Sequence, residues 1–131
     1  MWVRIRSIVF MVDRENNLIC EETAMKNPEL FDVIELLIDL PSHSLSAGDR
    51  GAICEEYDNS QYEVEFTNSD GESIALVALS IDSFVVVWRS ASKTWVPISE
   101  KIQAIVSTLP EENRSKVFEF ARSVHNERIS V

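Results

Sequence analysis

The stretch that decides the fold is QYEVEFT at residues 61–67, which continues directly into NSDG at residues 68–71. Polar and apolar residues alternate along it, so Tyr62, Val64 and Phe66 share one face of an extended chain. Asp-Gly is a common tip of a tight β-hairpin. The stretch therefore predicts a half-buried strand that turns back into a second strand.

Short segments of the same kind lie on both sides of this stretch. They are rich in β-branched and bulky apolar residues, and turn residues such as Pro41, Gly48 and Gly51 separate them. The predicted strands cover residues 30–38, 52–57, 61–67, 73–79 and 84–88. Five short strands at about ten-residue spacing, with no helix between them, indicate a small barrel or sandwich.

The hydrophobic period changes after residue 96, from that of a strand to that of a helix. A first apolar stripe combines Ile98, Ile102, Ile105, Val106 and Leu109. Pro110 with its two following acids opens a second helix, whose apolar face holds Val117, Phe120, Ala121 and Val124. The sequence predicts an α+β (mainly β) chain with a two-helix C-terminal tail at 96–131, packed on the barrel at 30–88 or on a partner.

Residues 1–29 form an N-terminal extension with two open interpretations. The alternating and then continuous apolar run from Val3 to Val12 predicts a strand, with a possible return at residues 18–20. Alternatively, Met25 starts the protein, and residues 1–24 are an upstream or misassigned addition. The apolar run at residues 8–12 is too short for a signal peptide and no stretch reaches the length of a membrane span, so we expect a cytoplasmic protein.

Negative charge is concentrated in the middle of the chain. The formal net charge is −10, and residues 25–95 carry four basic against thirteen acidic residues. A field of this sign repels phosphate backbones, because nucleic-acid affinity comes largely from Lys and Arg. It attracts a basic protein.

The sequence contains no recognisable set of catalytic or metal-binding residues. His43 and His125 lie in polar surroundings, without cysteine or acid at metal-ligand spacing. Cys20 and Cys54 form no C-x-x-C pair, which favours a reducing compartment, and Cys54 is expected to be the more buried. No catalytic, metal-binding or cofactor-binding residue is predicted, and we expect that the chain is not an enzyme.

Exposed acids and two tryptophans are the candidate partner-binding residues. Paired acids on strands and turns are typical of a solvated face or of a protein-docking face. Trp88 and Trp95 flank a polar hairpin-like link, and they either pack the tail onto the barrel or anchor a partner. The predicted partner-binding set is Glu55, Glu56, Glu63, Glu65, Asp70, Glu72, Trp88 and Trp95.

The stretch Leu30–Phe84 resembles an uncharacterised family of small bacterial SH3-like-barrel proteins. The residues that carry the resemblance are Asp32-Val33, Leu36, Leu40-Pro41, Leu45, Gly48, Gly51, the 62–66 block, Asp70-Gly71 and Leu79-Ser80. It implies a five-stranded SH3-like barrel. Through the G-x-x-G loop at residues 48–51, the barrel also looks like nucleic-acid-binding modules of ribosomal and transcription-elongation proteins.

The tail is similar to a short antitoxin-like helical family. Leu109-Pro110-Glu111-Glu112 followed by Val117, Phe118 and Phe120 carries that similarity. The leading hypothesis is a non-catalytic protein-binding module, acting as an antitoxin or immunity component on a basic partner. The alternatives are a nucleic-acid or ribosome-associated barrel, with Arg50 as a contact, and an accessory subunit of an enzyme complex.

Overall fold

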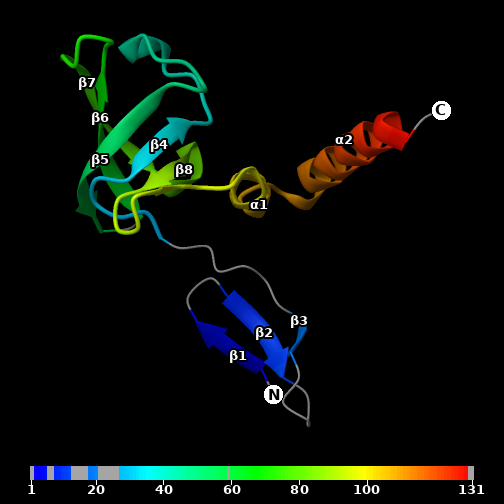
Figure 1. Ribbon diagram of the computed structural model, residues 1–131. Coiled ribbons are helices and arrows are strands. Elements are labelled where there is room, and N and C mark those ends of the chain that lie inside the picture. Colours follow the sequence, from blue (N-terminus) through cyan, green and yellow to red (C-terminus); the bar gives the residue numbers. More distant parts are fainter. Residues whose placement is uncertain (1, 6–7, 13–17, 21–26, 59, 130–131) are drawn as a thin grey trace.

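The computed structural model describes residues 2–5, 8–12, 18–20, 27–58 and 60–129, with side chains described from residue 27 onward, apart from residues 59 and 129 (Figure 1). Two antiparallel sheets are present in this part of the chain. The smaller sheet has the order β1-β2-β3 and consists of β1 (Trp2–Ile5), β2 (Ile8–Val12) and β3 (Leu18–Cys20). The strand and return expected within residues 1–24 are therefore present.

The larger sheet has six antiparallel strands in the order β7-β6-β5-β4-β8-β9. Its members are β4 (Val33–Leu36), β5 (Arg50–Tyr57), β6 (Gln61–Thr67), β7 (Ser73–Ser80), β8 (Phe84–Arg89) and β9 (Thr94–Trp95). The sequence predicted a half-open barrel of five strands; the structure has an open antiparallel sheet of six strands, with β9 as the sixth. The polar link between Trp88 and Trp95 is the turn of the β8–β9 hairpin.

Two short 3-10 helices join strands of this sheet. The first, η1 (Pro41–His43), lies between β4 and β5, where Pro41 cannot extend the strand. The second, η2 (Ile81–Ser83), turns the chain from β7 into β8. Because β8 then pairs with β4, the first strand of this sheet in chain order lies beside the fifth.

The hydrophobic core lies on one face of the six-stranded sheet. Ile34, Ile53, Val64 and Phe66 are almost completely buried there, and Tyr62 meets Phe84 edge-on, with 5.7 Å between ring centroids. This is the apolar face predicted from the alternation in residues 61–67. Fully burying side chains of this size stabilises the fold by about 1.5–3 kcal/mol each.

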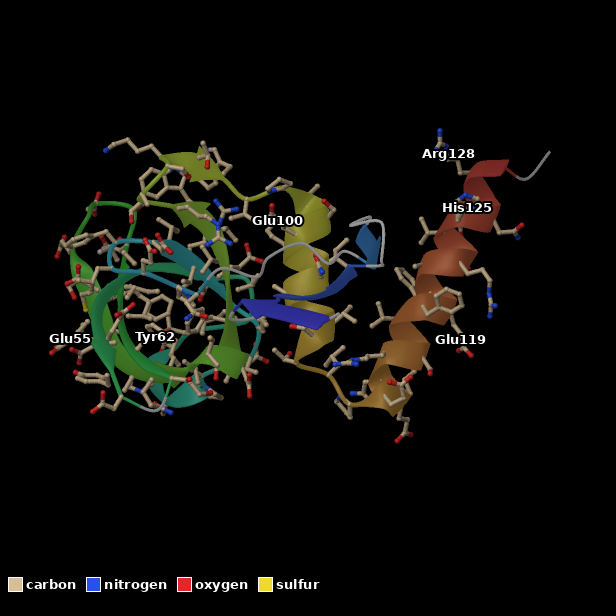
Figure 2. The ribbon with its side chains drawn as sticks, turned by 90° about the horizontal axis from the view of Figure 1, so that it is seen from below. Glu55, Tyr62, Glu100, Glu119, His125 and Arg128 are labelled. Atoms are coloured by element: carbon tan, nitrogen blue, oxygen red, sulfur yellow. The ribbon has the colours of Figure 1, made fainter. Side chains whose placement is uncertain are left out.

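The C-terminal tail forms α1 (Ile98–Ser107) and α2 (Glu111–Ile129). Helix α1 packs against β8, whereas α2 projects away from the sheet (Figures 1 and 2). Neither of these described helices contains a segment that is both long and apolar enough to span a membrane. The α+β, mainly β class with two C-terminal helices is confirmed.

The apolar stripe predicted for the first helix only partly faces the sheet. Ile98 and Ile102 are 70% and 51% exposed, and the side of α1 that lies over the sheet presents Glu100, Gln103, Ala104 and Ser107. On α2, Val117 is half-buried, while Phe118, Phe120 and Val124 are exposed. The tail therefore leaves most of its apolar residues at the surface.

Candidate functional site

The face of β5, β6 and β7 opposite the core carries the candidate site. The register pairs Glu65 with Leu76, Glu63 with Ala78, and Glu55 with Glu63. Directly paired residues point to the same side of a sheet. Glu55, Glu63 and Glu65 therefore form an acidic group beside apolar residues of β7, and we call these three residues the acidic triad.

A β-bulge at Cys54 decides which acids join the triad. Ile53 pairs with Val64 but Glu55 pairs with Glu63, so β5 contains one residue more than β6 at this point. Strict alternation from Ile53 would have turned Glu55 inward. With the bulge, Glu55 lies on the outer face, and Glu56, paired with the buried Tyr62, lies on the core side.

Tyr57 links two members of the triad. Its hydroxyl donates a hydrogen bond to Glu63 Oε2 at 3.0 Å and lies 3.4 Å from Glu55 Oε2. The hydrogen bond to Glu63, then desolvation and the charge of Glu55, raise the pKa of Tyr57 to about 12. The phenol therefore remains a proton donor to the carboxylates throughout the neutral range.

Cys54 lies against the same carboxylates. The expectation that Cys54 is a buried apolar side chain is wrong, because the bulge places this residue on the exposed outer face. The comparison with Cys20 lies outside the residues whose side chains are described. Its thiol donates to the backbone oxygen of Glu63 at 3.4 Å. Desolvation and the charges of Glu63, Glu65 and Glu55 raise the pKa of Cys54, which makes it a poor nucleophile at neutral pH.

The other predicted acids are at the periphery of this face. Asp70 and Glu72 are exposed in the β6–β7 hairpin, where the side chain of Asn68 accepts hydrogen bonds from both of their backbone N–H groups. Among the described residues, three ion pairs are present, and they join Arg50 to Glu35, Arg89 to Glu100 and Arg114 to Glu111. The acidic triad takes part in none of these three.

The two tryptophans pair across the β8–β9 hairpin. Trp88 is half-buried, whereas Trp95 is 64% exposed, and the guanidinium of Arg50 lies 5.5 Å from the centre of the Trp95 ring. Arg50 also contacts Glu35 at 3.5 Å. By register, Trp88 pairs with Val33, Val33 with Ala52, and Ala52 with Glu65, so the tryptophans and the triad occupy opposite ends of one sheet face.

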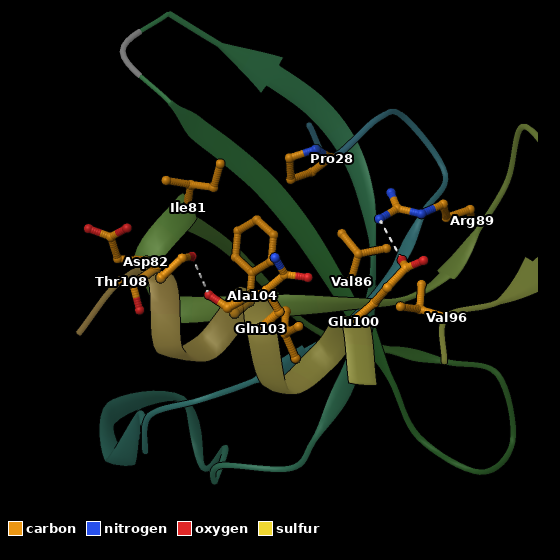
Figure 3. A pocket seen from close by; sticks show the side chains of 13 residues that line it. Pro28, Ile81, Asp82, Val86, Arg89, Val96, Glu100, Gln103, Ala104 and Thr108 are labelled. Atoms are coloured by element: carbon orange, nitrogen blue, oxygen red, sulfur yellow. Dashed lines mark hydrogen bonds and ion pairs between the residues drawn. The ribbon is translucent and has the colours of Figure 1, made fainter. Parts of the chain in front are cut away.

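A cavity that the sequence did not predict lies between α1, η2 and β8 (Figure 3). Its volume is about 220 Å³, which is enough for about seven water-sized groups. Phe84, Val86, Val96 and Ala104 give it an apolar wall, and Arg89 and Glu100, 3.9 Å apart, lie beside one another along it. The hydrophobic period of α1 predicted that its isoleucine side packs on the sheet. The cavity instead lies against the other side of the helix, and the sequence pattern alone does not show this packing.

The part of the chain whose side chains are described contains no obvious set of metal ligands. No group of three or more His, Cys, Asp or Glu residues is arranged there to hold a metal ion. His43 lies in η1, and His125 lies on the exposed helix α2 (Figure 2). The site's chemistry is that of exposed carboxylates, a phenol and neighbouring apolar side chains.

Fold and surface together define a mainly β domain with an acidic outer face. Residues 30–86 match the family described as Domain of unknown function (DUF4926). The sequence analysis assigned nearly the same stretch to an uncharacterised family, and this match confirms that the stretch is a domain of unknown function. Neither the comparison with curated proteins nor the comparison with solved structures finds a similar protein.

Proposed function

We propose that this chain is a non-catalytic, cytoplasmic protein-binding module that engages a basic protein partner through the acidic triad. The observation that carries the proposal is the direct cross-strand pairing of Glu55 with Glu63. Like charges directly opposite each other destabilise a sheet. A basic side chain of a partner placed beside the two carboxylates would offset that repulsion, so this pair favours a basic partner.

The surroundings of the triad support a protein partner over a small ion. Exposed Ile74 and Leu76 lie beside it on β7 and add apolar contact area. Trp95, at the other end of the same sheet face, is exposed and fits the role of a peripheral anchor. The charge of −9 over residues 25–95 accelerates the approach of a basic protein.

We also propose that the domain has an SH3-like fold. The strand order β7-β6-β5-β4-β8, with a short 3-10 helix before β8, is compatible with an SH3-like barrel left open at its edges. Small β domains of this kind serve many unrelated functions, so the functional argument depends on the surface and not on the fold.

Charge reversal tests the electrostatic part of the proposal. The variant Glu63→Lys/Glu65→Lys should bind a labelled lysine-rich peptide at least tenfold more weakly than the unaltered chain at low salt. Salt should weaken binding to the unaltered chain strongly and binding to the variant little. The matched control is Glu111→Lys/Glu112→Lys on α2, which makes the same change in net charge far from the triad. Equal loss in both variants would show that only net charge matters.

The antitoxin or immunity role is a further part of the proposal, and the antitoxin-like tail 109–120 motivates it. Once a stoichiometric partner is purified, its activity can be measured with and without this chain. Inhibition supports an antidote. A partner that is active only in the presence of this chain supports an accessory subunit instead.

A further inference from the structure

Strand β7 lies at one edge of the six-stranded sheet, paired with β6 on its inner side. No described strand pairs with its outer side. Alternate backbone N–H and C=O groups of an edge strand point away from the sheet and can pair with another extended chain. The edge is eight residues long, which is enough for a full strand-to-strand ladder.

The sequence of β7 lacks most of the features that usually protect such an edge. SIALVALS at residues 73–80 contains no charged residue and no proline. Its register with β6 is regular from residue 75 to residue 80, and the irregularity lies near the hairpin. Natural proteins commonly place lysine, proline or a bulge at an exposed edge to prevent unwanted pairing. Because β7 lacks lysine and proline and its irregularity is confined to the hairpin end, residues 75–80 are open to strand addition.

The outer face of β7 is also apolar and exposed. Ile74 and Leu76 are each 54% exposed, and Ala78 is exposed between Leu76 and the end of the strand. The triad lies immediately behind them, since Leu76 pairs with Glu65 and Ala78 with Glu63. An added strand would therefore meet apolar side chains first and carboxylates second.

We propose that β7 is the docking edge for an extended basic segment of a partner protein, which adds to the sheet as a further strand. This inference rests on the proposed function, because it names the binding mode of the same acidic face. A residue opposite Ala78 would lie two strand spacings, about 10 Å, from Glu63. Because Ala78 is small, a lysine or arginine at that position can extend over it to the carboxylate.

The negative charge of the acidic triad favours a basic segment of a partner at β7 over a second copy of this chain. Pairing two β7 strands would bring two acidic triads to the same sheet face, and like charges across an interface disfavour association. A segment with a basic and an apolar residue two positions apart matches this face, because residues i and i+2 of a strand point to the same side. Its apolar residue can meet Leu76, and its basic residue opposite Ala78 can reach Glu63.

The test uses the full chain and a ten-residue peptide in which every second residue is alternately lysine and valine, with threonine at the positions between, so that lysine and valine share one face of the strand. Fluorescence anisotropy at low salt should show binding, and β7 backbone amides should become protected from hydrogen exchange. A control peptide with prolines in place of two central valines should bind at least tenfold more weakly, because proline cannot donate to the ladder. No binding of either peptide would overturn both this inference and the proposed function.

Two substitutions separate the binding mode from simple charge attraction. Leu76→Glu adds negative charge but removes apolar contact at the edge, so it should weaken binding about tenfold. Ile102→Glu, at a similarly exposed position on α1, should have little effect. If Leu76→Glu binds as well as the unaltered chain while Glu63→Lys/Glu65→Lys does not, strand addition is wrong and the proposed function stands. If only Leu76 matters, the acidic partner-binding proposal fails instead.

Sedimentation of the chain alone tests the alternative occupant. A concentration-dependent dimer that Leu76→Glu converts to a monomer would show that β7 pairs with a second copy. That result would overturn the assignment of a basic partner segment. A monomer at all concentrations is the expected result.

Discussion

The buried carboxylate of Asp32 accepts a hydrogen bond from the backbone N–H of Ser90 at 2.8 Å, although the two residues are 58 positions apart. The Ser90 hydroxyl donates to the same oxygen at 3.0 Å, and the other carboxylate oxygen accepts from the Glu29 N–H at 2.9 Å. Asp32 is 1% exposed. It therefore connects the chain segment before β4 to the β8–β9 hairpin.

Asp32→Ala should lower the free energy of unfolding by about 3 kcal/mol, because it leaves N–H donors without their charged acceptor. Urea denaturation followed by tryptophan fluorescence measures the change. The control is Asp39→Ala, since Asp39 also accepts from a backbone N–H, that of Ala47 at 2.8 Å, but is exposed. Its loss should stay below about 1 kcal/mol. Equal losses would contradict a special contribution of burial.

Gly51 is required by a close approach of β5 to β6. A Cβ atom at this position would lie 2.7 Å from Val64 Cγ1 and 2.8 Å from the backbone oxygen of Glu65. Gly51→Ala should therefore destabilise the domain by about 1–3 kcal/mol, as overpacking does. Thermal or urea unfolding checks this prediction.

The double variant Gly51→Ala/Val64→Ala identifies the cause. Removing the Val64 methyl groups relieves one of three clashes, the third being with Phe66 Cδ1 at 2.9 Å. The combined loss should therefore be smaller than the sum of the single losses by about 0.5 kcal/mol or more. Strict additivity would place the strain on the Glu65 backbone oxygen and the Phe66 ring.

Residues 61–67 show what the sequence could establish. Their alternation predicted the buried face and the outward position of Glu65, because the side-chain period of a strand is two. The β7 return after the Asp-Gly hairpin followed for the same reason. Local patterns were sufficient for strands such as β6, whose alternation is not interrupted by a bulge.

Cys54 shows what local patterns could not establish. The bulge at this residue reverses the facing of Glu55 and Glu56, and no residue type in the segment announces it. The sixth strand is two residues long and forms only because Trp95 pairs with Trp88. The cavity beside α1 likewise depends on a helix orientation that places polar residues over β8. Each of these features is set by a tertiary contact and not by a local period.

Tyr57 should titrate with a pKa of about 12. Absorbance at high pH measures phenolate formation, and a Tyr62→Phe background isolates Tyr57 from the other tyrosine. Because the hydrogen bond to Glu63 is the largest cause, Glu63→Gln should move the pKa back toward its usual value near 10. Glu56→Gln, on the opposite face, should change it little.

The raised pKa of Tyr57 makes the stability of the folded chain depend on pH in the alkaline range. The folded-state pKa of Tyr57 is raised above the unfolded value near 10. The interactions of the protonated Tyr57 hydroxyl therefore stabilise the folded chain fully below pH 10, and this stabilisation is lost as the pH rises toward 12. Unfolding measurements should show a smaller alkaline loss of stability in Tyr57→Phe than in the unaltered chain. Identical alkaline profiles would contradict this coupling.

Cys54 should react slowly with iodoacetamide at neutral pH although it is exposed, because its pKa is raised and the thiolate is the reactive form. Alkylation is measured in a Cys20→Ser background. Desolvation, the largest cause, is present in every variant, but Glu63→Gln/Glu65→Gln removes the next two causes and should increase the rate several-fold.

Glu56→Gln, a charge removed from the same strand but on the core side, should leave the rate nearly unchanged. If the two variants react alike, net charge controls the thiol. If the triad variant alone accelerates it, the carboxylates on the outer face act on Cys54 directly, as the bulge geometry requires.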